Sequence, residues 1–256
     1  MKAALAGTLL FAAACANAAD SAKPADAAKP ETRIGVALGQ EWLSNSLPDF
    51  REQSVTFEHR WSRRHGVGVD LGRTERFGLR DTRVALRYDR PFGERLTFSG
   101  DASVSPEHHI LPKHALGAGL QFELARAWLL HGRVHHSAYD GVKVNQASAG
   151  VEHYFSNFSW IVLAHSTRAF ERTVSSAELR FNYYYGERDA IGLLGAAGEE
   201  AVYVGNAVTL SRVRALALIG RHELSPHWSV NYSIGRTRQG NFYDKNGVHL
   251  GLQYRY

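Results

Sequence analysis

The sequence predicts an all-β protein, an antiparallel transmembrane β-barrel of the outer-membrane type with about 14 strands. Three observations lead to this prediction. Apolar and polar residues alternate along most of the chain from Arg33 onward, which is the period of a strand with one apolar face. After the first residues no apolar run reaches the roughly 18 residues of a membrane-spanning helix. The alternation also continues through residues 248–256 to the final residue, as expected of a strand that closes a sheet.

The predicted strands follow one another along the chain with short connections. Clean alternation marks strands at 33–39, 55–61, 67–71, 83–89, 96–104, 116–124, 128–135, 146–152, 178–183, 228–235 and 248–256. The pattern is less regular at 158–168, 190–197 and 208–220, which are also predicted as strands. Without the last two of these segments the barrel would have about twelve strands, which is the alternative.

The connections and the aromatic residues distinguish this barrel from a soluble β-sandwich, which also has alternating strands. Every second connection is short, whereas the segments "LSNSLPDFREQ", "SPEHHILPK" and "RTRQGNFYDKNG" predict longer loops outside the cell. Aromatic side chains collect at membrane interfaces, and a sandwich has no reason to sort them by strand direction. Four tryptophans fall at the same predicted rim, namely Trp61, Trp128, Trp160 and Trp228.

The chain divides into three predicted parts. Residues 1–18 resemble a secretory signal peptide with a small-residue cleavage site, residues 19–32 form a flexible periplasmic tether rich in Ala, Lys and Pro, and residues 33–256 form the barrel. Cys15, the only cysteine, offers the alternative of a lipid anchor. The predicted location is the outer membrane of a Gram-negative bacterium.

The last strand is predicted to guide assembly. Its apolar face resembles the C-terminal signal that outer-membrane proteins present to their assembly machinery, and it is formed by Leu250, Leu252, Tyr254 and Tyr256. The expected partners are therefore outer-membrane lipid and the barrel assembly machinery.

The middle of the chain carries a specific set of residues, namely Ser105-Pro106, Leu111-Pro112, the segment "HSAYD" at 136–140, and Glu152 with Tyr154. In these residues it is similar to the YaiO family of outer-membrane β-barrel proteins. The resemblance covers about residues 33–256, with specific residues only in the middle third. The resemblance implies an outer-membrane location and an association of some members with surface polysaccharide production. It implies no catalytic mechanism.

The polar face of the strands is predicted to line the lumen. Its candidates are Glu58, Arg60, Arg83, Arg87, Asp101, Glu123, Arg133, His135, Glu152, Glu178 and Arg180. Arg212 and Arg214 are expected on the same face. Mixed charges on an inner wall are able either to pair and close the barrel or to line a polar path.

Histidines suggest two further kinds of site, neither of which the sequence favours. His135 and Ser137 have the spacing of a serine–histidine pair in a membrane lipid hydrolase, but their face should point into the lumen and no third residue clearly orients the histidine. His108, His109 and His114 lack the fixed geometry of a metal site, so neither a metal nor another cofactor is predicted.

The sequence therefore favours a non-enzymatic barrel, either a narrow polar conduit or a docking barrel associated with envelope polysaccharide export. The alternatives are an outer-membrane lipid hydrolase and a closed structural barrel. The chain has 30 basic and 25 acidic residues spread along its length, without the basic block of a nucleic-acid site, so no nucleic-acid partner is expected.

Overall fold

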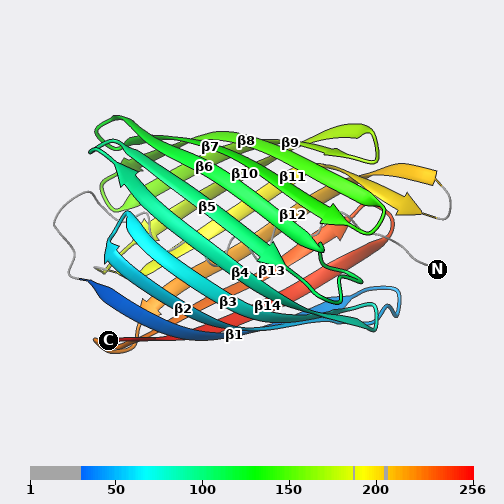
Figure 1. Ribbon diagram of the computed structural model, residues 1–256, viewed down its shortest axis with the longest axis horizontal. Coiled ribbons are helices and arrows are strands. Elements are labelled where there is room, and N and C mark those ends of the chain that lie inside the picture. Colours follow the sequence, from blue (N-terminus) through cyan, green and yellow to red (C-terminus); the bar gives the residue numbers. More distant parts are fainter. Residues whose placement is uncertain (1–29, 187, 205–206) are drawn as a thin grey trace.

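Fourteen antiparallel strands close on themselves, because β1 pairs with β14 as well as with β2. The structure is a computed structural model that describes residues 30–186, 188–204 and 207–256. Figure 1 shows the strands tilted around one barrel, with β1 beside β14. The strands are β1 (Glu31–Leu43), β2 (Phe50–Ser62), β3 (His65–Arg76), β4 (Leu79–Phe92), β5 (Leu96–Val104), β6 (His114–Ala125), β7 (Trp128–Tyr139), β8 (Val142–Phe155), β9 (Phe158–Ala169), β10 (Arg172–Tyr184), β11 (Ala190–Val204), β12 (Ala207–Glu223), β13 (Trp228–Gln239) and β14 (Tyr243–Arg255).

This architecture confirms the predicted barrel and its strand number. The barrel begins at Glu31, two residues before its predicted start at 33. The predicted signal peptide, 1–18, and the tether up to residue 29 lie outside the described residues. Within the described part of the chain, no helix is long and apolar enough to span a membrane.

The outer face carries the apolar side chains of the alternation. Val36, Leu38, Leu86, Leu116 and Val134 are all exposed on it. A soluble protein would bury such a continuous apolar surface, whereas a lipid bilayer covers it. We call the opposite face, which points into the barrel, the inner wall.

The segments with irregular alternation are complete strands, and their inner wall explains the irregularity. β11 and β12 turn apolar side chains inward, and Leu194, Ala217 and Ile219 form a buried cluster there together with Ala215. Because both faces of these strands are apolar, the polarity does not alternate with period two. The same arrangement corrects one prediction: Arg212 and Arg214 are exposed on the outer face of β12 and do not line the lumen.

The connections are shorter than predicted at one end of the barrel. Residues 44–49 and 105–113 form the two long ones, but the predicted loop at 236–247 is mostly strand, with a turn at 240–242 between β13 and β14. The strands extend through this charged segment, and Arg236 and Arg238 remain exposed on their outer face beside Asp244. Loop length therefore distinguishes the two ends less clearly than the sequence predicted.

Candidate functional site

Charged side chains pair with one another along the inner wall of β2, β3 and β4. Arg60 lies 2.7 Å from Glu58 and 3.9 Å from Asp89. Arg87 also contacts Asp89, at 2.9 Å, and Arg83 contacts Asp70 at 2.8 Å. Most pairs join residues on the same strand or on neighbouring strands, and Arg60 reaches Asp89 across β3, so the charges balance locally along the wall.

The pairing continues through β5 to β10. Arg133 binds Asp101, and His131 lies 2.9 Å from Glu152, which also accepts a hydrogen bond of 2.6 Å from the Tyr154 hydroxyl. On β10, Arg180 donates to Glu178 at 2.9 Å. Glu123 is half-buried near the turn between β6 and β7 and follows the same inward alternation. The structure thus brings most of the candidate lumen residues into pairs, and their functional role stays a prediction.

His135 and Ser137 do approach each other. Ser137 Oγ lies 3.3 Å from His135 Nδ1, and His135 Nε2 lies 3.7 Å from Asp101 Oδ2. The order Ser, His, Asp is that of an acyl-transfer triad, with Asp101 in a role for which the sequence offered no clear residue. However, Ser137 is only 2% exposed and shares the inner wall with Arg133, so neither bilayer lipid nor a lumenal ester reaches its hydroxyl.

Buried polar contacts also link β14 to β1 and β13 to β11. Lys245 on β14 lies 3.0 Å from the carboxylate of Glu41 on β1, and both side chains are buried. Gln239 on β13 donates to Glu200 on β11 across 2.8 Å, over the intervening β12. Lys245, Gln239 and Glu200 were not among the sequence candidates, although their inward position follows from the alternation of β11, β13 and β14.

The segment 105–113, which we call the wall loop, carries the Ser-Pro and Leu-Pro pairs of the family resemblance. β4 begins at Leu79, but its pairing with β5 begins only at Val84. Residues 79–83 of β4 therefore have no partner in β5. The wall loop fills this position. Asp81 is fully buried and accepts hydrogen bonds from the backbone N–H groups of His109, Ile110 and Leu111, at 2.7 to 3.0 Å.

The histidines of the wall loop bind protein groups. The Nδ1 atom of His109 lies 2.9 Å from Asp81, and that of His108 lies 2.7 Å from the carbonyl oxygen of Pro106. No group of three or more His, Cys, Asp or Glu in the described ranges is placed to hold a metal ion. The wall loop is thus bonded to β4 through Asp81.

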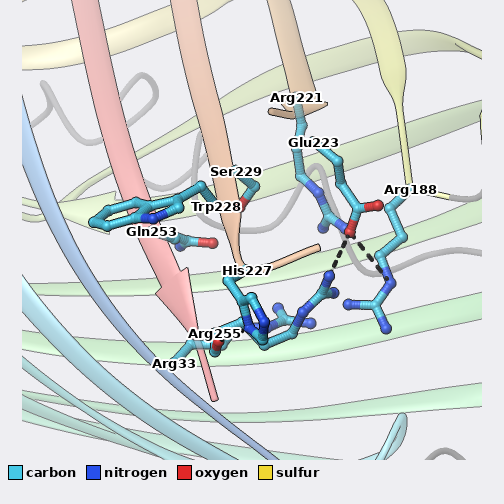
Figure 2. Close-up of a pocket in the computed structure, with 9 residues that line it drawn as sticks. All are labelled: Arg33, Arg188, Arg221, Glu223, His227, Trp228, Ser229, Gln253 and Arg255. Atoms are coloured by element: carbon cyan, nitrogen blue, oxygen red, sulfur yellow. Dashed lines mark hydrogen bonds and ion pairs between the residues drawn. The ribbon is translucent and has the colours of Figure 1, made fainter. Parts of the chain in front are cut away.

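The end of the barrel where β1 begins and β14 ends, which we call the terminal mouth, holds a pocket rich in arginine. Arg33, Arg188, Arg221 and Arg255 line this arginine pocket together with Glu223, His227, Trp228, Ser229 and Gln253. Figure 2 shows Arg188 and Arg255 both reaching the carboxylate of Glu223, while the Trp228 ring lies away from them. The alternation of β14 places Arg255 on the inner wall, but it does not predict the convergence, because Arg188 comes from the turn between β10 and β11.

The four predicted interface tryptophans lie at the same end. Trp61 lies at the end of β2, and Trp128, Trp160 and Trp228 lie at or near the starts of their strands, so all four share the terminal mouth. Trp128 packs against Trp160 with ring centroids 5.8 Å apart, and Trp228 packs against Tyr254 at 4.9 Å. Their role at the membrane interface stays a prediction.

The outer face of β14 carries the predicted assembly signal. Leu250, Leu252 and Tyr256 are exposed there, and Tyr254 is half-buried against Trp228. The backbone N–H of Tyr256 donates to the carbonyl of Thr32, so the last residue still contributes to the closure with β1. Recognition of this face by assembly machinery stays a prediction.

Known structures share this architecture. The chain is similar to an outer membrane channel from Pseudomonas putida F1, with 12% sequence identity and a TM-score of 0.59 over 92% of this chain and 100% of that chain. It is also similar to a bacterial polysaccharide outer membrane secretin (9% identity, TM-score 0.56, 91% and 100% covered) and to the CymD monoaromatic hydrocarbon channel (11% identity, TM-score 0.55, 89% and 88% covered). At these identities the likeness shows the fold alone.

The family assignment comes from the sequence. No curated protein matches the chain closely enough to count as a relative. Residues 31–202 match the YaiO membrane beta barrel domain, a range that runs from the start of β1 into β11 and includes the wall loop. With its closed barrel and apolar outer face, the protein is located in the outer membrane. Because the match covers more than half of the sequence, the chain belongs to the YaiO family of membrane β-barrel proteins.

Proposed function

We propose that this barrel is not an enzyme and that it offers a narrow polar route or a docking surface to a saccharide, in association with envelope polysaccharide export. The observation that carries this proposal is the paired but incompletely buried inner wall. The side chains of Arg87 and Arg133 are each 40% exposed although both are ion-paired. Exposed guanidinium groups are suited to donate hydrogen bonds to the hydroxyl oxygens of sugars.

The size of the barrel supports a narrow route. Barrels of eight strands are filled by side chains, whereas those of sixteen to eighteen strands leave an aqueous channel, and the fourteen strands of this barrel lie between these sizes. The channel and polysaccharide secretin structures with the same fold are consistent with such a use of the barrel, although their titles describe only those proteins.

A closed structural barrel is the first rival. The apolar cluster on β11 and β12 and the buried Glu41–Lys245 pair remove part of the polar lining from the lumen. If these groups meet the opposite wall, the paired charges of β2 to β8 serve only to hold the barrel together, and no solute passes.

A lipid hydrolase is the second rival, favoured by the 3.3 Å contact between Ser137 and His135. The reaction would need a nucleophile that faces its substrate, with a donor positioned for the oxyanion. The burial of Ser137 and the engagement of Asp101 by Arg133 favour a structural hydrogen bond instead.

The test combines two assays on one sample. Purified protein is inserted into planar bilayers for conductance measurements and is incubated in parallel with phospholipid for detection of released fatty acid. Conductance steps without hydrolysis are expected. Silence in both assays would leave only a docking or structural role, and hydrolysis that disappears in Ser137→Ala would contradict the proposal.

A further inference from the structure

We propose that four arginines on the outer face of β12 and β13 bind the phosphate groups of a lipid in the outer leaflet of the membrane. They are Arg212 and Arg214 on β12 and Arg236 and Arg238 on β13, and we call them the outer arginine patch. All four side chains are exposed. Because they face away from the lumen, this inference is independent of the proposed saccharide route and adds a second binding surface to the protein.

The strand register places these guanidinium groups side by side. Arg214 lies directly opposite Arg238 in the pairing of β12 with β13. Residues two apart on a strand share a face, so Arg212 lies on the same side of β12 as Arg214, and Arg236 lies on the same side of β13 as Arg238. Opposite residues in a sheet have Cβ atoms about 4.5 to 5.5 Å apart, and like charges at such positions repel each other. An anion bound between the two strands would remove this repulsion.

Basic groups outnumber acidic groups on this part of the outer face. Residues 196–216 and 234–248, which include the connections between β11 and β12 and between β13 and β14, contain eight charged side chains. Two of them, Glu200 and Lys245, face inward and bind groups of the inner wall. The other six are the outer arginine patch, Glu199 and Asp244. Residues 205 and 206, which lie outside the described residues, are uncharged. Four guanidinium groups thus stand against two carboxylates.

The two carboxylates are unevenly placed within the patch. The carboxylate of Asp244 lies 2.5 Å from Arg236 and 3.7 Å from Arg238, so it pairs with the arginines of β13. Glu199 occupies the position opposite Arg212 in the pairing of β11 with β12. Among the described residues, neither arginine of β12 forms an ion pair. The β12 side of the patch is therefore where an external anion gains most from these charges.

The patch lies at the depth of the lipid headgroups. Leu216 and Ile234 are its neighbours toward the middle of the barrel, and their side chains are 63% and 53% exposed on the same face. Trp42 on β1 is also exposed, and it lies opposite Asn246, which in turn lies opposite Arg236. Apolar side chains meet the lipid tails, and tryptophan collects at the interface with water. The patch thus begins where the hydrocarbon layer ends.

A lipid phosphate fits this position better than a solute. The planar guanidinium group binds two oxygens of a phosphate at once, and the long arginine stem can lie along the apolar wall while its charge stays among the headgroups. A solute in the lumen lies on the other side of the wall and does not reach the outer face. The expected partner is therefore a phosphorylated lipid.

The leaflet follows from the end of the barrel that carries the patch. This end lies opposite the terminal mouth and has the two longest connections, 44–49 and 105–113. Outer-membrane barrels place their longer loops outside the cell and their short turns in the periplasm. This arrangement assigns the patch to the outer leaflet.

Binding is tested by native mass spectrometry on the full-length protein in neutral detergent. The probe is lipid A with both of its phosphates, and the control is the same lipid with both phosphates removed. The phosphorylated lipid is expected to bind about tenfold more tightly, because the guanidinium groups form charge-assisted hydrogen bonds with phosphate. The difference should shrink as the concentration of ammonium acetate rises and screens the charges. Equal binding of the two lipids would overturn the proposal.

Variants assign the binding to the patch. Arg214→Gln with Arg238→Gln removes the opposed pair and should weaken binding of the phosphorylated lipid about tenfold. Asp244→Asn should strengthen it, because a carboxylate that competes for the arginines of β13 is lost. The matched control is Arg95→Gln with Arg126→Gln, which removes the same charge from exposed turns at the terminal mouth and should bind like the parent. An equal loss in both double variants would assign the binding to overall charge and overturn the proposal.

Folding and the leaflet are checked in the same series. Heat-modifiable gel mobility establishes that each variant forms a barrel, and Arg214→Gln alone is measured if the double variant does not fold. The leaflet is tested with Asn241→Cys, in the turn between β13 and β14, in a Cys15→Ala background. This cysteine is expected to react with a membrane-impermeant maleimide on intact cells. A reaction that occurs only after lysis would place the patch in the inner leaflet and overturn the proposal.

Discussion

Asp81 shows how one buried carboxylate orders a whole segment. Its side chain is fully buried and receives three backbone N–H groups and the His109 imidazole from the wall loop. Asp81→Ala should therefore lower the free energy of unfolding by about 2 kcal/mol, since it leaves buried donors without an acceptor. Urea denaturation of protein folded in lipid vesicles measures this change.

The matched control is Glu171→Gln, which alters an exposed carboxylate in the turn between β9 and β10. Its stability should stay within about 0.5 kcal/mol of the parent, as is usual for surface substitutions. Equal stability of Asp81→Ala and the parent would show that the wall loop does not depend on these bonds.

The sequence predicted the inward direction of most polar residues but not their partners. Alternation places Asp101 and Arg133 on the same face, yet only the strand register brings them together. Asp81 could not be identified because its partners come from a loop whose path is set by the early end of β5. Arg212 and Arg214 were assigned to the wrong face because the inward residues of β12 are apolar, so polarity alone gave no direction.

At the scale of elements, the wall loop should respond to pH through Glu107. Its carboxylate accepts hydrogen bonds from the backbone N–H and the hydroxyl of Thr82, and these bonds lower the pKa of Glu107 below its usual value of 4.5. A lowered pKa stabilises the folded loop above the unfolded value, and that contribution is lost as the pH falls from about 4.5 through the lowered pKa. We therefore expect proteinase K to cleave within 105–113 faster as the pH falls from about 4.5 through the lowered pKa of Glu107. The cleavage rate is measured after brief incubation at each pH.

Glu107→Gln separates this group from other carboxylates of the wall. The variant should be cleaved faster than the parent at pH 7, and the difference between the two proteins should shrink below pH 4.5. A difference that stays constant across this range would exclude Glu107 as the titrating group.

The terminal strand closes the barrel, and its aromatic end is expected to affect assembly. Replacing Tyr254 and Tyr256 with Ser removes apolar area from the outer face of β14, next to its seam with β1. The amount of heat-modifiable barrel in isolated outer membranes should fall several-fold. Tyr183→Ser removes a comparable exposed aromatic from the end of β10 and should have a smaller effect. Equal accumulation of both variants would show that the terminal strand carries no special signal.

The alternation identified strands in proportion to the polarity of their inner face. It was clear on β2, β4 and β7, where charged side chains line the wall. It was weak on β9, β11 and β12, where Ile161, Leu163 and Leu194 alternate inward and make both faces apolar. The sequence predicts a loop at the extended ends of β13 and β14 because their outer residues are charged, a pattern that a strand adopts once it rises beyond the membrane.

At the scale of the whole molecule, every functional conclusion depends on which face meets the lipid. If the outward residues of β7 face the bilayer, then His135, Ser137 and Arg133 face the lumen, and the polar route and the arginine pocket share one interior. If the faces were reversed, Ser137 and His135 would meet the lipid and the hydrolase would become the better account.

The most direct measurement is a nitroxide scan along β7 in liposomes, with single cysteines at 130–135 in a Cys15→Ala background. Oxygen partitions into lipid, whereas a nickel chelate stays in water, so their collision rates report the surroundings of each site by electron paramagnetic resonance. We expect oxygen access to peak at 130, 132 and 134 and nickel access to peak at 131, 133 and 135, following the exposed outer position of Val134. A scan without a period of two, or one with the opposite phase, would contradict the account.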